Sequence, residues 1–475
     1  MSLWGSRFTD KADYSLMQLS RSVQFDWRLA PYEIEVNLAH LKNLESAAVI
    51  DKADALKIKE ALIELAKEIG SGKFTFSAED EDVHSAIERG LIAKCGPAGG
   101  AIRAGRSRND LVATDFKLYL IDHLLEVSHL VLALITVINQ KGKDNLEVVA
   151  PGFTHTQHAQ PISFAQELSK HCQSLLRDVD RIFDWLKRNS KSPFGAGALA
   201  GTSLVMQPEK IAKDLGFSSV MENSIDAVSD RDFAAEALFS LAMLGVHISR
   251  IGEEFILWSS SEFKWVELSD QYTTGSSIMP QKKNADIAEL ARAKSGRFIG
   301  NLTSLLVVLK ALPFGYNRDL QEDKEPVFDS IDQILLLLPA LSGMIKSAKF
   351  NLPQISKTVA DDFSLATEIA DYLAKKQVPF AKAHEVAGAC VKLCEKMGIT
   401  LPQLTDDQLV SIHPMLGSDL RESLDVKSAI TSRSSSLGTA PVSVAKAISK
   451  IEQQIKEAEI SISETRKRFS GMISQ

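Results

Sequence analysis

The segment 274–297 carries the strongest chemical signal in the chain. It reads TGSSIMPQKKNADIAELARAKSGR, so two serine hydroxyls, two lysine ammonium groups and an asparagine amide precede a stretch with helical spacing. Gly275 and Pro280 exclude regular structure in the first half, whereas Asn284 and Asp286 predict the N-cap and first turn of a helix. A flexible loop of this composition before a rigid helix suits the binding and conversion of an anionic substrate.

A second polar segment, GRSRND at 105–110, opens a long helical pattern. Asn109 or Asp110 could cap this helix, which alone would explain the pair. Arg106 and Arg108 beside a helix N-terminus would also form a carboxylate site, since guanidinium groups bind carboxylates bidentately. We favour the binding role, and capping remains the alternative.

A third segment, GFTHTQHAQPI at 152–162, places two histidines before a helix that is expected to begin at Pro161. A loop histidine such as His155 or His158 is more often a structural hydrogen bonder than a catalyst. The two histidines have no third ligand in a fitting pattern, so the sequence predicts no metal site. The stretch YNRDLQEDKE at 316–325 would, by polarity alone, be a solvated connection.

Long helices must position these segments. Apolar residues recur at three- and four-residue steps from Phe116 to Ile138, the pattern of a long helix with one buried face. The same pattern returns at about 228–263, 284–311 and 326–349. Pro339 is expected to kink the last of these helices. Because strand-type alternation is nearly absent, the predicted fold class is all-α.

We expect three domains. Residues 1–105 form an N-terminal helical domain that ends at the glycine-rich CGPAGG, residues 106–352 form a bundle of very long helices, and residues 353–475 form a C-terminal domain of shorter helices. Helices with such wide apolar faces need partners, which a symmetric assembly of subunits would supply.

The composition is that of an ordinary soluble globular protein, with 475 residues, 45% hydrophobic and 24% charged. A net charge of -7 leaves no electrostatic footprint for nucleic acid or an anionic membrane. The four cysteines lack disulfide or zinc spacing and are expected to be reduced core thiols. The first residues, MSLWGSRF, contain no apolar h-region, so no signal segment is expected, and no later run is expected to be long enough to span a bilayer. A cytoplasmic enzyme is therefore expected.

GSSIMPQKKN at 275–284 resembles the signature loop of the fumarase/aspartase superfamily, whose members eliminate a group from a succinyl unit and release fumarate. The stretch 316–325 and GRSRND resemble argininosuccinate lyases in particular. Further matches to that family are LWGSRF at 3–8, EDVH at 81–84, GALAGT at 197–202 and DRD at 230–232. The resemblance thus covers essentially the whole chain.

This resemblance implies a reversible elimination that splits argininosuccinate into arginine and fumarate by general base and general acid catalysis. It implies that Ser276 abstracts the proton while Lys282 and Asn284 grip the substrate. His155, held by Glu289, would act as the acid or as an orienting group. A free serine is a poor base, so loop closure must bring cations and backbone donors that stabilise its alkoxide. No cofactor is needed.

The same residue-by-residue matching implies further substrate-binding residues. They are Ser22, His84, Arg108, Asn109, Thr154, Tyr316, Gln321 and Lys324. In this family, segments around Asn109, His155 and Ser276 come from different subunits of a homotetramer, so the central bundle is expected to join a tetrameric helical core. Long helices make this reasonable, because their ends lie far apart within one chain.

The departures from the family pattern include Ala285, where proline is usual, and Leu111, where glutamine is common. Neither removes a group with a chemical role. Another lyase of the superfamily is disfavoured by Lys283 and by the 316–325 stretch. A structural protein similar to the lens crystallins of this fold is the other alternative, and the presence of every proposed catalytic group speaks against it.

Overall fold

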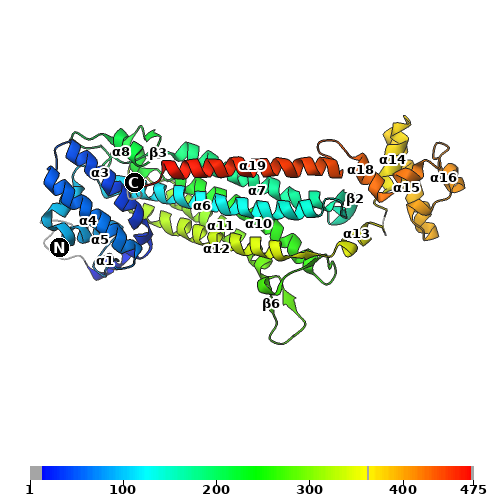
Figure 1. Cartoon of the computed structure of the whole chain (residues 1–475), viewed down its shortest axis with the longest axis horizontal. Helices are drawn as coiled ribbons and strands as arrows, with labels where there is room; N and C mark the ends of the chain where they lie inside the picture. Colours follow the sequence, from blue (N-terminus) through cyan, green and yellow to red (C-terminus); the bar gives the residue numbers. More distant parts are fainter. Residues whose placement is uncertain (1–12, 361–362, 472–475) are drawn as a thin grey trace.

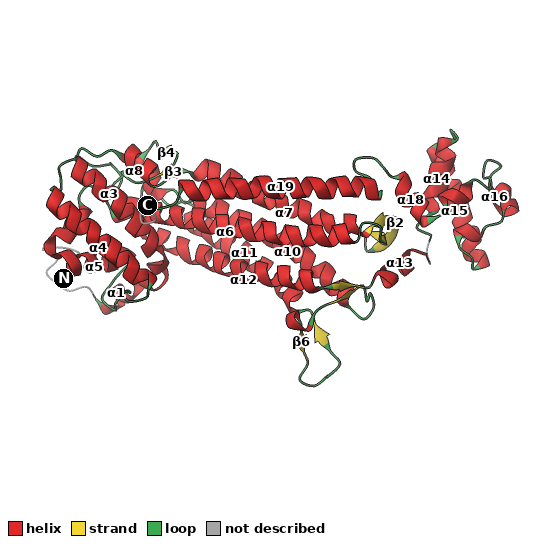
Figure 2. Cartoon of the chain, in the orientation of Figure 1, coloured by secondary structure: helices red, strands yellow, loops and turns green. Residues whose placement is uncertain are grey.

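The computed structural model describes residues 13–360 and 363–471, so the motif at 3–8 lies outside the described residues. The molecule is an elongated helical rod (Figure 1). Short helices of the N-terminal part form one end, long helices run through the middle, and a separate group of short helices forms the other end. Within the described residues, strands occur only as short pairs (Figure 2). The predicted all-α class is confirmed.

The helices are given in chain order. Those of the N-terminal part are α1 (Tyr14–Ser20), α2 (Val23–Asp26), η2 (Trp27–Leu29), α3 (Ala30–Ser46), α4 (Lys52–Gly70), α5 (Val83–Cys95) and η3 (Gly96–Arg103). The middle contains α6 (Arg108–Asp144), α7 (Phe164–Asn189), α8 (Pro208–Asp214), α9 (Ser224–Ser229), α10 (Asp232–Ser259), η4 (Asp270–Tyr272), α11 (Asp286–Leu309), η5 (Arg318–Asp323) and α12 (Lys324–Ser347). The last part contains α13 (Leu352–Ala360), α14 (Ala366–Lys375), α15 (Phe380–Met397), η6 (Leu401–Gln403), α16 (Asp406–Ile412), α17 (Leu420–Ser423), α18 (Val426–Ser432) and α19 (Pro441–Arg468).

Four strand pairs join these helices. They are β1 (Val149–Thr154) with β2 (Gln157–Ser163), β3 (Lys191–Ser192) with β4 (Ser219–Val220), β5 (Val266–Glu267) with β8 (Lys349–Phe350), and β6 (Thr274–Gly275) with β7 (Lys283–Asn284). Only β3 and β4 are parallel.

The predicted long helices are present, but three predicted starts are wrong. Ser107 caps α6 in a capping box with Asp110, so neither Asn109 nor Asp110 is the N-cap. Asn284 belongs to β7, and Ala285 occupies the position before α11. Pro161 lies in β2, and α7 begins three residues later. Asn109 and Asp110 thus lie in the first turn of α6, whereas Asn284 and Pro161 belong to hairpins that precede their helices.

The C-terminal segment divides between two cores. Helices α14 to α18 enclose a hydrophobic cluster of their own, which includes Leu373, Cys390 and Leu420. Helix α19 instead runs back along α6 and α7, and its Ile451 and Ile455 belong to the main core. The range 353–475 therefore contains a helix of the central bundle, while the predicted domain boundaries stay predictions.

Three helices contradict the expectation that no run is long enough to span a bilayer. By length and composition alone, α6, α10 and the continuous stretch of η5 and α12 each qualify. These helices are apolar over much of their circumference because several neighbours pack on them, and 50% to 61% of the residues in their most apolar stretches are buried within the chain. Pro339 lies inside α12, and its expected kink stays a prediction.

Candidate active site

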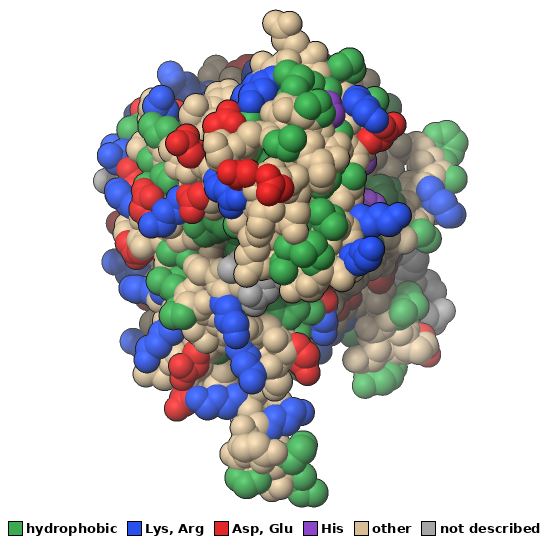
Figure 3. Space-filling view, turned by 90° about the vertical axis from the view of Figure 1, so that its right-hand side faces the viewer, with side chains coloured by type: hydrophobic (Ala, Val, Ile, Leu, Met, Phe, Trp, Pro, Cys, Tyr) green, Lys and Arg blue, Asp and Glu red, His purple; other side chains and the backbone are tan. Residues whose placement is uncertain are grey.

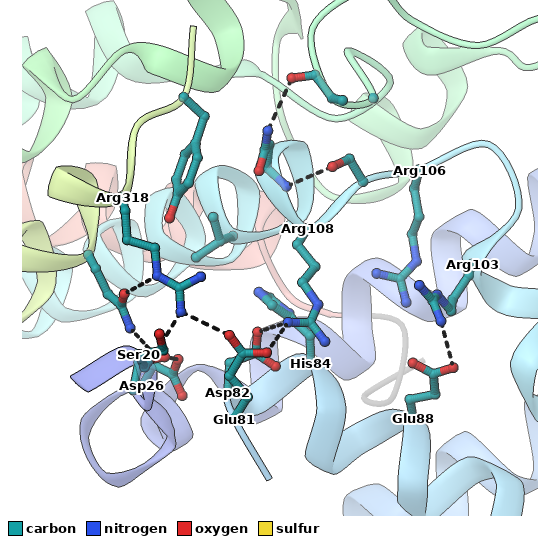
Figure 4. A pocket seen from close by; sticks show the side chains of 18 of the residues that line it. Ser20, Asp26, Glu81, Asp82, His84, Glu88, Arg103, Arg106, Arg108 and Arg318 are labelled. Carbon is teal, nitrogen blue, oxygen red and sulfur yellow. Dashed lines mark hydrogen bonds and ion pairs between the residues drawn. The ribbon is translucent and has the colours of Figure 1, made fainter. Parts of the chain in front are cut away.

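A cavity of about 650 Å³ lies where α5, the start of α6 and η5 meet (Figure 4). Most of the predicted substrate-binding residues line it: Ser22, His84, Arg108, Asn109, Tyr316, Gln321 and Lys324. The fold thus brings together residues that are up to 300 positions apart in the sequence, while their binding role stays a prediction.

The start of α6 is tied to the glycine-rich loop GALAGT. The Asp110 carboxylate accepts hydrogen bonds from the backbone N–H groups of Gly195 (3.1 Å) and Gly197 (2.9 Å). The Asn109 amide donates to the Ala198 carbonyl at 3.2 Å. Gly197 has a φ of 60°, and a Cβ atom there would lie 2.7 Å from the Gly201 carbonyl oxygen, so a side chain is excluded. This loop fixes one wall of the cavity.

Two carboxylates and two arginines form a network across the cavity (Figure 4). Nη1 of Arg108 lies 2.5 Å from the Asp82 carboxylate and 3.2 Å from the Glu81 carboxylate. The other oxygen of Glu81 accepts a hydrogen bond from Arg318 at 2.9 Å. Burial works against the charge of Arg108, but Asp82 and Glu81 outweigh it and raise the pKa of the guanidinium. Arg108 is therefore a permanent cation with acidic partners.

His84 is held from behind the cavity by Glu33, whose carboxylate lies 2.8 Å from Nδ1. Both side chains are buried. Burial lowers the pKa of His84, but Glu33 outweighs this effect, so the pKa is raised. The contact at Nδ1 fixes the ring and leaves Nε2 for a ligand.

Glu33, His84 and Asp115 also form a group that could hold a metal ion, with one possible ligand atom from each within 4.8 Å of the others. Both Asp115 oxygens are buried without a hydrogen-bond partner. Burial, followed by the charge of Glu33, raises the pKa of Asp115 well above its ordinary value. The half-buried Arg106 guanidinium interacts with both carboxylates. Its positive charge disfavours a further cation here.

Besides Glu33 and Asp115, two further acids of this region were not identified from the sequence. Asp26, one helical turn after Ser22, accepts hydrogen bonds from the Ser22 hydroxyl (2.6 Å) and the Val83 N–H (3.0 Å). Burial raises the pKa of Asp26 to about 6. The Asp323 carboxylate accepts hydrogen bonds from the Lys324 ammonium group at 2.7 Å and from the Arg231 guanidinium group. The spacing of Ser22 and Asp26 was the available signal for the first, since residues four apart share a helix face.

The pair of Asp323 and Arg231 explains two of the sequence motifs. Both side chains are fully buried, and burial of charge is tolerated only with a well-bonded partner. The polar 316–325 stretch is therefore partly core, and not the solvated connection that its composition alone would suggest. The ion pair also positions Lys324 at the cavity.

His155 lies elsewhere, at the tip of the β1–β2 hairpin near the opposite end of the bundle (Figure 1). His155 and Thr156 form a two-residue turn with φ of 54° and 59°. Such a turn favours Asn-Gly, and each non-glycine residue costs about 1 kcal/mol or more in this conformation. Among the residues that the structure describes, the His155 imidazole bonds to none. A strained turn that displays an unbonded histidine is typical of a functional position.

Ser276 lies on a loop between β6 and β7 that projects from the body (Figures 1 and 3). Its Oγ accepts hydrogen bonds from the backbone N–H groups of Ile278 (3.3 Å) and Met279 (3.1 Å). At the base of the loop, Lys283 pairs with Asp270 at 2.5 Å. Lys282 is exposed. The loop is thus held by its own contacts and presents its reactive groups to solvent.

Within one described chain, the predicted site residues form three separate groups. The first lines the cavity, the second is Thr154 with His155, and the third is Ser276 with Lys282, Asn284 and Glu289. The 37 residues of α6 span about 55 Å between the cavity and the end that leads to His155. The predicted contact between His155 and Glu289 is not formed between these described residues. One chain therefore does not assemble the whole predicted site.

Comparison with known proteins first defines a class. The family model described as "Lyase" matches residues 6–300. A solved EDDS lyase in complex with formate is 26% identical, with a TM-score of 0.84 over 94% of this chain and 90% of that one. A class II fumarase from Schistosoma mansoni shares the fold at 17% identity, with a TM-score of 0.72 over 86% of this chain and 91% of that one. The chain has the fold of the fumarase/aspartase superfamily.

Closer relatives define the family within this class. An argininosuccinate lyase of Frankia casuarinae is 50% identical over 93% of this chain and 95% of its own length. One of Streptomyces griseus is 50% identical over 95% of this chain and 96% of its own. The model described as "Argininosuccinate lyase C-terminal" matches residues 363–431. The chain therefore belongs to the argininosuccinate lyase family.

Proposed function

We propose that this chain is an argininosuccinate lyase that splits argininosuccinate reversibly into arginine and fumarate in arginine biosynthesis. Relatives with this name match it over almost their full length. The observation that carries the proposal is the mixed charge of the cavity, where Arg108 and Lys324 lie beside Asp26, Glu81 and Asp82. Argininosuccinate carries carboxylates as well as an ammonium and a guanidinium group, so such a cavity offers partners for both signs.

The reaction removes a proton from the succinyl carbon beside a carboxylate. The electron pair of that C–H bond forms the C=C bond of fumarate as the C–N bond breaks, and the guanidine nitrogen leaves with a proton as arginine. Negative charge develops on the adjacent carboxylate in the transition state, and fixed cations such as Arg108 stabilise it without reorganisation.

Ser276 is the proposed base. The two backbone N–H groups that donate to its Oγ also favour the alkoxide, because hydrogen bonds to a charged form stabilise that form. Lys282, on the same loop, would add a cation when the loop closes on the substrate. His155 is the proposed acid or orienting group, and Glu289 its proposed partner. The strained turn at His155 supports a functional role for that residue.

A homotetramer is the proposed assembly. Apolar side chains of α11 are about half exposed along the helix, namely Leu290, Ile299, Leu306 and Val307. Phe239 of α10 is exposed to a similar degree, and Leu336 of α12 to a greater one. Exposed apolar side chains on three neighbouring long helices favour burial against other copies of the chain. In such an assembly the hairpin, the loop and the cavity of one site would come from different subunits.

We further propose a cytoplasmic enzyme that needs no cofactor and binds neither nucleic acid nor membrane. The net charge of -7 supports the last two points. The three apolar helices are accounted for by packing within the chain and the proposed assembly.

The proposed function is tested by mixing the purified protein with argininosuccinate and following fumarate by its ultraviolet absorbance. We expect fumarate and arginine to appear in equal amounts. A folded, assembled protein that releases no fumarate would overturn the proposal.

A further inference from the structure

We infer that Glu81 is a specificity-determining residue of the cavity. Its carboxylate pairs with Arg108 and Arg318, which would otherwise be free to bind any dicarboxylate. The cavity therefore selects a substrate that carries a cationic nitrogen as well as carboxylates. This inference rests on the proposed function, because it concerns the same cavity.

The position of Glu81 between two arginines is the first support. One oxygen lies 3.2 Å from Nη1 of Arg108, and the other accepts from Nη2 of Arg318 at 2.9 Å (Figure 4). The two arginines come from different elements, the start of α6 and η5. Arg318 is fixed further by the Ser20 carbonyl (3.0 Å) and by Gln321 (3.0 Å). Glu81 thus lies where a substrate carboxylate would bridge the two guanidinium groups.

The second support is that the fold does not require the Glu81 carboxylate. The backbone oxygen of Glu81 accepts hydrogen bonds from the N–H groups of Ser22 (2.8 Å) and Val23 (3.1 Å). Its side-chain contacts among the described residues all go to the two arginines. Asp82 differs, because its carboxylate also caps α5 through the Ser85 N–H. The Glu81 carboxylate therefore acts on the arginines and not on the local structure.

The consequence for binding follows from charge. A plain dicarboxylate must break both ion pairs of Glu81 and would leave this partly buried carboxylate, 19% exposed, beside another anion. A substrate with an ammonium or guanidinium group instead offers Glu81 a new cationic partner when the substrate carboxylate binds the two arginines. Such a built-in repulsion discriminates against the wrong ligand without weakening the right one.

The test measures binding of succinate and of arginine to the intact protein by calorimetry, for the parent and for Glu81→Gln. Neither ligand alone undergoes the reaction. We expect succinate to bind about tenfold more tightly and arginine about tenfold more weakly in the variant, the effect of one charge-assisted contact. Glu88→Gln is the matched control, since Glu88 lines the same cavity but pairs with Arg103 at 3.4 Å. Its affinities should stay within twofold of the parent.

A second variant guards against a folding defect. Glu81→Asp keeps the charge, but its side chain is one methylene shorter and cannot reach both arginines. Succinate should therefore bind this variant about threefold more tightly than the parent. Unchanged succinate affinity in both variants, or a shift of succinate and arginine in the same direction, would overturn the inference. Failure of the proposed function is a separate result, because it is seen as absence of fumarate release from argininosuccinate by the parent protein.

Discussion

The cavity beside α6 and the two loops that carry His155 and Ser276 are built in different ways. Around the cavity, side chains from distant segments are buried and paired, as in the contacts of His84 with Glu33 and of Arg231 with Asp323. His155 and Ser276 lie on the connections of hairpins whose two strands pair only with each other. The comparison teaches that the fold of one chain assembles the proposed binding groups, whereas the proposed reacting groups are presented outward.

The lengths of the helices explain this division. Helix α6 separates the cavity from the β1–β2 hairpin, and α11, with 24 residues or about 36 Å, separates it from the β6–β7 loop. No movement of a short loop closes such distances. In the proposed homotetramer, the hairpin beside this cavity would come from another copy of the chain.

The largest effect is expected in the exposed loop. Ser276→Ala should lower kcat by about 10²- to 10⁴-fold and leave substrate binding nearly unchanged, because a base acts in the transition state. Steady-state kinetics and direct binding measure the two quantities. Ser277→Ala removes the neighbouring hydroxyl and serves as the control. If Ser276→Ala retained activity within tenfold of the parent, Ser276 would not be the base.

Beside the cavity, replacing a single buried carboxylate by an amide should lower the stability of the fold. Asp323→Asn leaves the buried Arg231 without its carboxylate, so we expect a loss of about 3–5 kcal/mol in the free energy of unfolding. Asp329→Asn, which removes a more exposed ion pair with Arg297, should cost less than about 1 kcal/mol. Denaturant unfolding at one protein concentration compares them. Equal losses would mean that the cavity is no more tightly built than the surface.

A smaller effect concerns pH. Burial raises the pKa of Asp26 to about 6 in the folded chain, above the value of 3.8 for an ordinary aspartate. The folded state therefore binds this proton more strongly, and ionised Asp26 costs the folded state up to about 3 kcal/mol above pH 6, a cost that disappears as the pH falls towards 4.

Asp26→Asn removes this titration. Its stability relative to the parent should be greatest at pH 7 and should decline as the pH falls from 6 to 4. Thermal unfolding across this range measures the difference, with the exposed Asp319→Asn as a control that should show no such trend. A difference that did not depend on pH would contradict the assignment to Asp26.

Some of these features could be predicted from the sequence, and the reasons differ by region. The apolar spacing from Phe116 to Ile138 marks α6, because a long helix leaves a periodic trace. The turn at His155 was not predicted from the sequence. Its positive φ angles follow from the pairing of β1 with β2, the strand that contains Pro161, and not from the conformational preferences of His155 and Thr156. Glu33 and Asp115 were missed because an acid in an apolar pattern shows no partner until the chain has folded.

The central claim is that one site is shared between subunits. His155→Asn and Ser276→Ala variants, each nearly inactive, should regain activity when they are unfolded together, mixed in equal amounts and reassembled. Random assembly would leave roughly a quarter of the sites with both residues intact, when those residues come from different subunits. Recovery to about that fraction of parental activity is the predicted result. Activity no greater than that of either variant, in assemblies shown by mass to be mixed, would contradict a shared site.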